Sequence, residues 1–268
     1  MEYLGILDGM YTNELEQAKS LAREAGEIMR QYFDGNQEMT IKEDHSPLTI
    51  ADTKINRLVI ERLEAVFPDD GVIGEEESTV EFGMGRIWFC DPIDGTSAFT
   101  WGVPTAMFSL ALVIDGRPVV GVCYEPMLDK LYWAVAGEGA YCNGRRLSVN
   151  TQTLEMGLLG IISDAYRLRH EAPYIDTLID RHVNLAPFYG AVAKCVRIAE
   201  GRLAGYLEEY VSAHDVAASQ VIVTEAGGRM TGLDGNEIDY SRPFKGVIVS
   251  NGIVHDELVR IVGETLRK

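Results

Sequence analysis

The sequence predicts an α+β protein in which layers of helices pack against layers of sheet. Apolar residues recur at helical spacing at both ends of the 268-residue chain, and short apolar runs separated by Gly, Pro or Asp-Gly fill its middle. Helices at both ends with strands between them favour stacked helix and sheet layers over a sandwich made of sheets alone. No repeat, low-complexity tract or flexible linker divides the chain, so we expect one domain.

Two helices are predicted before the first strand. After Thr12 and Asn13, either of which can cap a helix, apolar residues keep to one helical face over 15–33. A second helical pattern begins near 49–52 and stops at Pro68. Strands are then expected at the apolar runs VIGE, RIWFCD, FSLALVI, VVGVCYEP and KLYWAVA.

The last third of the chain is predicted to alternate between strands and helices. The strand patterns are LLGIIS, LAGYLEE and GVIVSN. The helical patterns cover about 173–182, 191–200, 215–226 and 254–267. The chain is therefore expected to end, as it begins, with a helix.

The charge balance excludes several classes of partner. The chain has 24 Lys and Arg against 41 Asp and Glu, a net charge of −17, whereas a nucleic-acid groove or an anionic membrane requires a basic face. The longest apolar run, 108–114, is far shorter than the roughly 20 residues of a membrane-spanning helix. The N-terminal segment MEYLGILDGMYTNELEQ carries acids where a secretory signal has a basic region. We therefore expect a cytoplasmic protein that binds neither nucleic acid nor membrane.

The four cysteines indicate neither a zinc site nor a disulfide framework. Cys90, Cys123, Cys142 and Cys195 are widely spaced, and no two of them form a CxxC pair. Buried, reduced thiols are the expected state.

The segment WFCDPIDGTSAF carries the strongest chemical signal. It predicts a strand that ends at Asp91, a turn at Pro92, and a short helix after Gly95 and Thr96. The carboxylates of Asp91 and Asp94 and the carbonyl of Ile93 could then meet one cation. The backbone N–H groups of Gly95 and Thr96 would favour an anion such as phosphate. The competing interpretation is an ordinary Asp-Pro-x-Asp-Gly turn that caps a helix.

Three other acids stand at the ends of apolar elements. Glu75 follows the run VIG, Asp52 lies near the start of the second helix, and Asp215 starts the helix of SAHDVAAS. Each has an ordinary interpretation, as a solvated acid or as a favourable charge at a helix N-terminus. Together with the DPIDGT acids they predict several elements that aim carboxylates into one cleft, where cations would neutralise them.

The segments DPIDGT, the upstream GEE and the downstream D-VAA…EAGG resemble the inositol monophosphatase family of metal-dependent, lithium-sensitive phosphatases. The resemblance implies an αβαβα layered sandwich of the inositol monophosphatase and fructose-bisphosphatase type. It further implies that a lobe of about 1–150 carries most metal ligands, and that a lobe of about 151–268 carries the last metal aspartate and the substrate contacts. Members of the family are commonly homodimers.

The resemblance also assigns roles to single residues. It implies two to three magnesium ions: a first held by Glu75, Asp91 and the Ile93 carbonyl, a second by Asp91, Asp94 and Asp215, and a third by Asp52 with Glu75. Thr96, held by Asp52, would orient and deprotonate the attacking water, so the implied catalytic set is Thr96, Asp52 and Glu75. The implied substrate contacts are Asp94, Gly95, Thr96, Ala191, Glu208 and Asp215, with Glu209 as a neighbouring alternative to Glu208.

The substrate is expected to be a small phosphorylated alcohol, inositol monophosphate first. Histidinol phosphate and phosphoadenosine phosphate are alternatives, because SPLTIAD and FPDDGVIGEE also resemble phosphatases of the same superfamily that act on them. Fructose bisphosphate is a further alternative from that superfamily. His214 stands where the family usually has Trp, and Tyr189, Gly190 and Ala191 stand where it has Gly-Thr-Ala. A regulatory binding protein that keeps the fold is the alternative from another class, and a passive cation-binding protein is a third.

Overall fold

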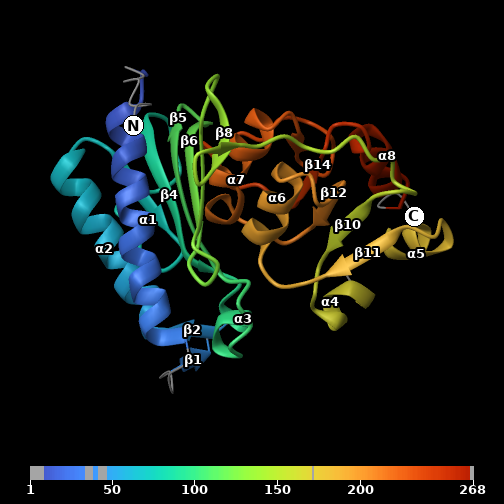
Figure 1. The fold of residues 1–268 in the computed structure, drawn as a ribbon, viewed down its shortest axis with the longest axis horizontal. Coiled ribbons are helices and arrows are strands. Elements are labelled where there is room, and N and C mark those ends of the chain that lie inside the picture. The colour runs from blue at the N-terminus through green and yellow to red at the C-terminus, as the bar shows by residue number, and fades with distance from the viewer. Residues whose placement is uncertain (1–8, 34–38, 42–46, 171, 266–268) are drawn as a thin grey trace.

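Helices and sheets alternate in layers, in the order helix, sheet, helix, sheet, helix, which confirms the predicted fold class (Figure 1). The computed structural model describes residues 9–33, 39–41, 47–170 and 172–265. Three clusters of buried apolar side chains fill the spaces between successive layers. Each layer therefore buries an apolar face against its neighbour, which is the main stabilising term in such an arrangement.

The outer helix layer consists of α1 (Thr12–Phe33) and α2 (Ile50–Val66), where the apolar spacing predicts helices. The first sheet has seven strands and lies beside these helices, to their right in Figure 1. In spatial order its strands are β3 (Gly71–Gly74), β4 (Arg86–Asp94), β5 (Met107–Ile114), β6 (Arg117–Glu125), β7 (Lys130–Val135), β8 (Gly139–Cys142) and β9 (Arg145–Arg146). β3 is parallel to β4, and the other neighbours are antiparallel.

The middle layer consists of α6 (Ala191–Ala199) and α7 (Ala213–Glu225), which pack on the other face of the first sheet. α7 comes close to β6 at Gly121, where there is no room for a side chain. A Cβ atom added to Gly121 would lie only 2.3 Å from the carbonyl oxygen of Ala218. The start of α7 lies beside β5, where Ser109 Oγ donates a hydrogen bond to the His214 carbonyl at 3.4 Å.

The second sheet packs on the far side of α6 and α7. It has five strands in the order β11 (Asn184–Pro187), β10 (Leu158–Ile161), β12 (Gly205–Glu208), β14 (Val247–Ser250) and β13 (Arg229–Thr231). β10 is parallel to β11 and β12, and β14 is antiparallel to β12 and β13. The outermost layer contains α4 (Ala165–His170), α5 (Ile175–Asp180) and α8 (His255–Thr265) (Figure 1).

Most predicted elements are confirmed, with one correction at the strand that carries the acids. β4 does not end at Asp91: it continues to Asp94, and its pairing with β5 shifts register between Asp91 and Asp94. The helix expected over 173–182 is shorter, 175–180, because Ala172 and Tyr174 belong to a turn. The predicted end of the last helix at 267 lies outside the described residues. Elements without a predicted counterpart are short: β1 (Met39–Ile41), β2 (Pro47–Thr49), β8, β9, β11, β13 and α4.

The four cysteines are free and buried, as predicted. Burial raises the pKa of the thiols of Cys123 and Cys195, the former to about 12, so neither is a reactive thiolate. Among the described helices, none is both long enough and apolar enough to cross a lipid bilayer.

Candidate active site

Three aspartates from two distant parts of the chain meet where β4 approaches the start of α7. Asp91 and Asp94 belong to β4 and Asp215 is the third residue of α7. One carboxylate oxygen of each lies within 4.8 Å of one oxygen of each of the others. Ser109 links the two regions, because it pairs with Asp91 across the sheet and its hydroxyl bonds the carbonyl of His214. The structure thus brings together three of the predicted metal ligands.

The irregularity in β4 sets the direction of its two aspartates. The Asp91 carboxylate accepts the Ile93 N–H at 3.0 Å, which closes a tight turn inside the strand. Asp94 accepts the N–H groups of Ala191 at 2.8 Å and Val192 at 2.9 Å, at the start of α6. A helix N-terminus favours a carboxylate, so α6 fixes Asp94 in the site.

Gly190 makes this clamp on Asp94 feasible. Its backbone has φ of +94°, a conformation that other residues rarely adopt. A Cβ atom at Gly190 would also lie 2.7 Å from Asp94 Oδ2. A side chain at this position would therefore push the carboxylate out of place.

The electrostatics of the cluster favour a bound cation. Burial, and then the charges of Glu75, Asp94, Asp215 and Asp52, raise the pKa of Asp91 well above its usual range. Burial and the Asp215 charge raise the pKa of Asp94 to about 7, against the opposing N–H donors of α6. Burial also raises the pKa of Asp215, which His214 and the Ser212 N–H partly offset. Buried carboxylates that disfavour their own charge are stabilised when a cation joins them.

Asp52 and Glu75 flank the three aspartates. Asp52 is buried in a capping box at the start of α2, where its Oδ2 accepts the Thr49 hydroxyl at 2.5 Å and the Thr49 N–H at 2.8 Å. Its other oxygen, Oδ1, is buried and has no hydrogen-bond partner among the described residues. Burial raises the pKa of Asp52 to about 7, with smaller contributions from the charges of Glu75 and Glu76. The backbone N–H of Glu75 donates to the Cys90 carbonyl at 3.0 Å, next to Asp91.

One expected contact is wrong in this structure. The Thr96 hydroxyl donates to the Ile93 carbonyl at 2.9 Å, and it is not hydrogen-bonded to Asp52. The reason is local, since Thr96 is the first residue of α3 (Thr96–Thr100) and its side chain folds back on the preceding turn. A carbonyl oxygen has two lone pairs, so Ile93 can still offer one to a cation.

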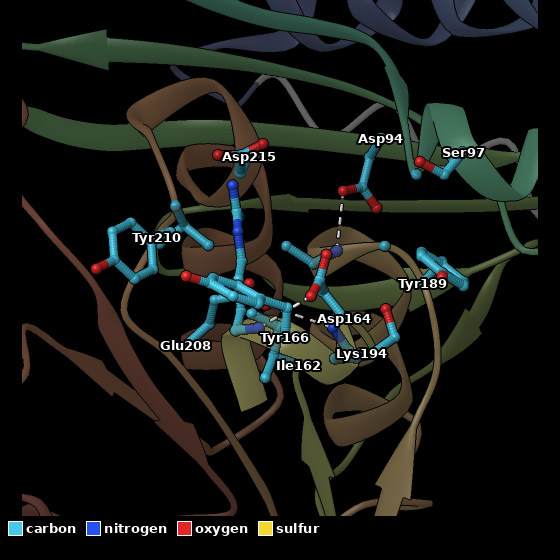
Figure 2. Close-up of a pocket in the computed structure, with 16 residues that line it drawn as sticks. Asp94, Ser97, Ile162, Asp164, Tyr166, Tyr189, Lys194, Glu208, Tyr210 and Asp215 are labelled. Carbon is cyan, nitrogen blue, oxygen red and sulfur yellow. Dashed lines mark hydrogen bonds and ion pairs between the residues drawn. The ribbon is translucent and has the colours of Figure 1, made fainter. Parts of the chain in front are cut away.

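A cleft of about 590 Å³ opens from the aspartate cluster (Figure 2). Asp94, Asp215 and Gly95 line one end, and the other lining residues come from the start of α6, from the end of β12 and from the segment 162–167, which runs from the end of β10 into α4. Of the predicted substrate contacts, the cleft wall contains Asp94, Gly95, Ala191, Glu208 and Asp215, but Ser97 instead of Thr96. His214 does not line the cleft, and its Nε2 lies 3.8 Å from Asp215 Oδ1.

The structure separates the two adjacent glutamates that the sequence left open. Glu208 faces the cleft, whereas Glu209 accepts a hydrogen bond from the Tyr174 hydroxyl at 3.2 Å inside the protein. Successive residues of a strand point to opposite faces, so only one of the two can reach the cleft. Sequence reasoning missed Lys194, which lines the cleft beside Glu208 (Figure 2). A single lysine inside the apolar helix AVAKCVRIA was the available signal.

Comparison with known proteins agrees with this geometry. The model of the inositol monophosphatase family matches residues 10–267. The chain is 35% identical over 265 residues to a histidinol-phosphatase of Mycobacterium tuberculosis, covering 93% of this chain and 98% of that protein. It is 31% identical over 222 residues to a fructose-1,6-bisphosphatase/inositol-1-monophosphatase of Thermotoga maritima, covering 82% of this chain and 84% of that protein.

The solved structures lead to the same family. An inositol monophosphatase of Thermotoga maritima superposes with a TM-score of 0.86 at 28% identity, over 96% of this chain and 99% of that one. The chain belongs to the inositol monophosphatase family and is a phosphatase, a phosphoric monoester hydrolase.

Proposed function

We propose that this protein hydrolyses the phosphate ester of a small polyol, inositol monophosphate first, with Mg²⁺ as its cofactor. The observation that carries the proposal is the cluster of the buried Asp91 and Asp94 with the half-buried Asp215, whose ligand oxygens lie within 4.8 Å of one another at the end of a cleft. An acidic protein with such a cluster would bind an anionic ester through cations instead of arginines.

The donor set fits Mg²⁺. Every candidate ligand is a hard oxygen, from carboxylates and the Ile93 carbonyl, and the cluster contains neither His nor Cys. Asp52 adds a buried oxygen that still needs a partner. When bound, two to three magnesium ions would neutralise phosphate oxygens and lower the pKa of a coordinated water.

The protein's own groups would then position the substrate and help to deprotonate the attacking water. We assign Thr96, with Asp52 and Glu75, to the attacking water. The Thr96 hydroxyl would release its bond to Ile93, accept a hydrogen bond from that water, and turn its own proton towards Asp52, so that the proton of the water passes through Thr96 to that carboxylate. The N–H groups of Gly95 and Thr96 would contact the phosphate, and Ala191, Glu208 and Asp94 the alcohol.

Histidinol phosphate is the second candidate substrate. The observation in its favour is the 35% identity to a histidinol-phosphatase over 93% of this chain. The charges of the cleft favour the polyol instead, because the buried ammonium group of Lys194 stands in the cleft wall.

A substrate panel tests both parts of the proposal. We would rank inositol 1-phosphate, histidinol phosphate, fructose 1,6-bisphosphate and phosphoadenosine phosphate by kcat/KM in magnesium buffer. We expect inositol 1-phosphate to rank first, chelator to abolish turnover, and added Mg²⁺ to restore it. Metal-independent hydrolysis would overturn the assigned metal site, and a higher kcat/KM for histidinol phosphate would overturn the assigned substrate.

A further inference from the structure

Lys194 places a buried positive charge in the wall of the cleft. It lies on α6, one helical turn after Ala191, and its side chain is only 3% exposed. Among the charged residues of the described chain, no other Lys or Arg is so deeply buried. Burying an ammonium group costs free energy unless partners replace its water.

The protein replaces that water only in part. Lys194 Nζ donates one hydrogen bond, to Glu208 Oε2, at the long distance of 3.4 Å. The ammonium group otherwise faces aromatic rings, those of Tyr206 at 4.7 Å and Phe188 at 5.8 Å. Because an ammonium group carries three donors, Lys194 has N–H groups left for a ligand in the cleft.

Glu208 offers the complementary acceptor. Its Oε2 receives both the Lys194 ammonium and the Tyr206 hydroxyl, and none of the hydrogen bonds between described residues uses Oε1. A donor and an acceptor therefore stand side by side in the cleft wall (Figure 2). This is the pairing that adjacent hydroxyl groups satisfy, since each hydroxyl both donates and accepts.

The remaining charges of the cleft do not change this balance. Apart from the metal-site aspartates, the charged lining residues are Asp164 and Arg167, of opposite sign and near solvent. The backbone N–H of Arg167 donates to Asp164 Oδ1 at 2.9 Å, and the Arg167 guanidinium lies 5.3 Å from the centroid of the Tyr210 ring. Solvent screens the charges of Asp164 and Arg167 more than those of the buried Lys194 and Glu208. Lys194 and Glu208 therefore have the larger effect on which charge the alcohol can carry.

We infer that Lys194 determines specificity in the alcohol part of the site, by binding a hydroxyl oxygen of a phosphorylated polyol beside Glu208 and by excluding alcohols that carry a cation. The inference rests on the proposed phosphatase function. Histidinol phosphate carries an ammonium group, and Glu208 cannot compensate it fully because Lys194 already shares that carboxylate. A neutral polyol meets no such repulsion.

The test is the ratio of kcat/KM for inositol 1-phosphate to kcat/KM for histidinol phosphate. Met is unbranched and similar in length, so Lys194→Met removes the charge without opening a large cavity. It also leaves Glu208 free to pair with the substrate's ammonium group. We expect the ratio to fall at least tenfold in Lys194→Met. Lys19→Met is the control, because Lys19 also lies over a ring, that of Trp133 at 4.0 Å, and neither residue lines the cleft; it should leave the ratio unchanged.

A second variant covers the case in which Lys194→Met does not fold. Lys194→Met with Glu208→Gln removes both charges, so no unpaired carboxylate stays buried, and the ratio should again fall, but by less. A ratio within threefold of the wild type in the variant that folds would overturn the inference. So would a wild-type preference for histidinol phosphate.

Two further measurements separate this inference from the proposed function. Magnesium-dependent turnover of p-nitrophenyl phosphate, which has no polyol, reports the metal site alone, and its absence would sink the proposed function. In that case the relative affinities of inositol and histidinol can still be measured, by competition NMR in the presence of inorganic phosphate. Stronger binding of inositol by the wild type, reversed in Lys194→Met, supports the inference, and equal preferences in the two proteins overturn it.

Discussion

At the scale of single residues, the same local bond can have different consequences. Thr96 and Thr100 are both on α3, and each hydroxyl donates at 2.9 Å to the carbonyl three residues earlier, Ile93 and Ser97 respectively. Only the Thr96 bond ends on a carbonyl next to the aspartate cluster. Comparing substitutions of Thr96 and Thr100 therefore distinguishes the contribution of a threonine hydroxyl to the helix from its contribution to the site.

We predict that Thr96→Ala lowers the magnesium-dependent kcat by about 100-fold or more, the usual range for losing a group that handles a proton. Steady-state kinetics with inositol 1-phosphate measures this, and thermal unfolding checks that the variant folds. Thr100→Ala loses the same kind of hydrogen bond and should keep kcat within about twofold, as expected of a change away from the reacting atoms. Thr96→Ser should recover most of the activity. Near-normal turnover in Thr96→Ala would contradict the assigned role.

At the scale of elements, two of the site's acids are held by the same motif. Asp52 and Asp215 are each the third residue of a helix, in capping boxes with Thr49 and Ser212. The boxes consist of short-range bonds, so the sequence predicts the start of α2 near 49–52 and that of α7 to within two residues, at Asp215 instead of Ala213. It cannot predict that Asp52 Oδ1 points into the protein, because the packing of α2 on the sheet decides that.

Where prediction from the sequence failed, the cause was pairing between distant segments. Pro92 predicted that the strand ends at Asp91, but Asp94 pairs with Met107 of β5 and prolongs it. The choice between Glu208 and Glu209 depends on the register of β12 against β14, which local residues do not encode. The sequence did not predict Lys194 as a site residue, because its place in the cleft depends on contact with Glu208, which is 14 residues away on another element.

The capping box of α2 leads to a prediction that couples stability to activity. The Thr49 hydroxyl bond lowers the pKa of Asp52 against the larger effect of burial. Thr49→Ala should therefore raise that pKa, move the acid limb of the kcat profile to higher pH, and cost about 1 kcal/mol of stability. Thr49→Ser keeps the hydroxyl and is the control for both measurements. A loss of stability with an unmoved pH profile would show that Asp52 has no part in turnover.

At the scale of the whole molecule, the site ties together elements from different layers. Asp91 and Asp94 come from the first sheet, Asp215 from α7, and α6 clamps Asp94. A cation bound by these groups would connect the sheet to the middle helices. Metal binding is therefore expected to affect the stability of the whole fold, in addition to the chemistry at one point.

The raised pKa values give the metal-free protein a definite pH dependence. Asp52 and Asp94 have pKa values of about 7 in the folded protein against 3.8 as the ordinary value, so the folded state holds protons that the unfolded chain releases. Their stabilising contribution is complete below about pH 4 and is lost as the pH rises to about 7. We predict that, in the presence of chelator, the contribution of these carboxyl groups lowers the Tm of the protein as the pH rises from 5.5 to 8.

Magnesium should reverse that trend, because it binds the deprotonated carboxylates and therefore binds more tightly at higher pH. At 100 times its Kd, Mg²⁺ adds about 2.7 kcal/mol, and each kcal/mol raises Tm by about 2–4 °C in a protein of this size class. We expect a magnesium-induced rise in Tm of about 5–10 °C at pH 8 and a much smaller one at pH 5.5. Asp91→Asn removes one metal ligand and one buried carboxylate. The difference in Tm between the wild type and this variant at each pH therefore reports the site alone, because the other charges of the protein, whose net charge is −17, are common to both. A magnesium effect of equal size at both pH values, or one retained in Asp91→Asn, would mean that these aspartates do not form the metal site.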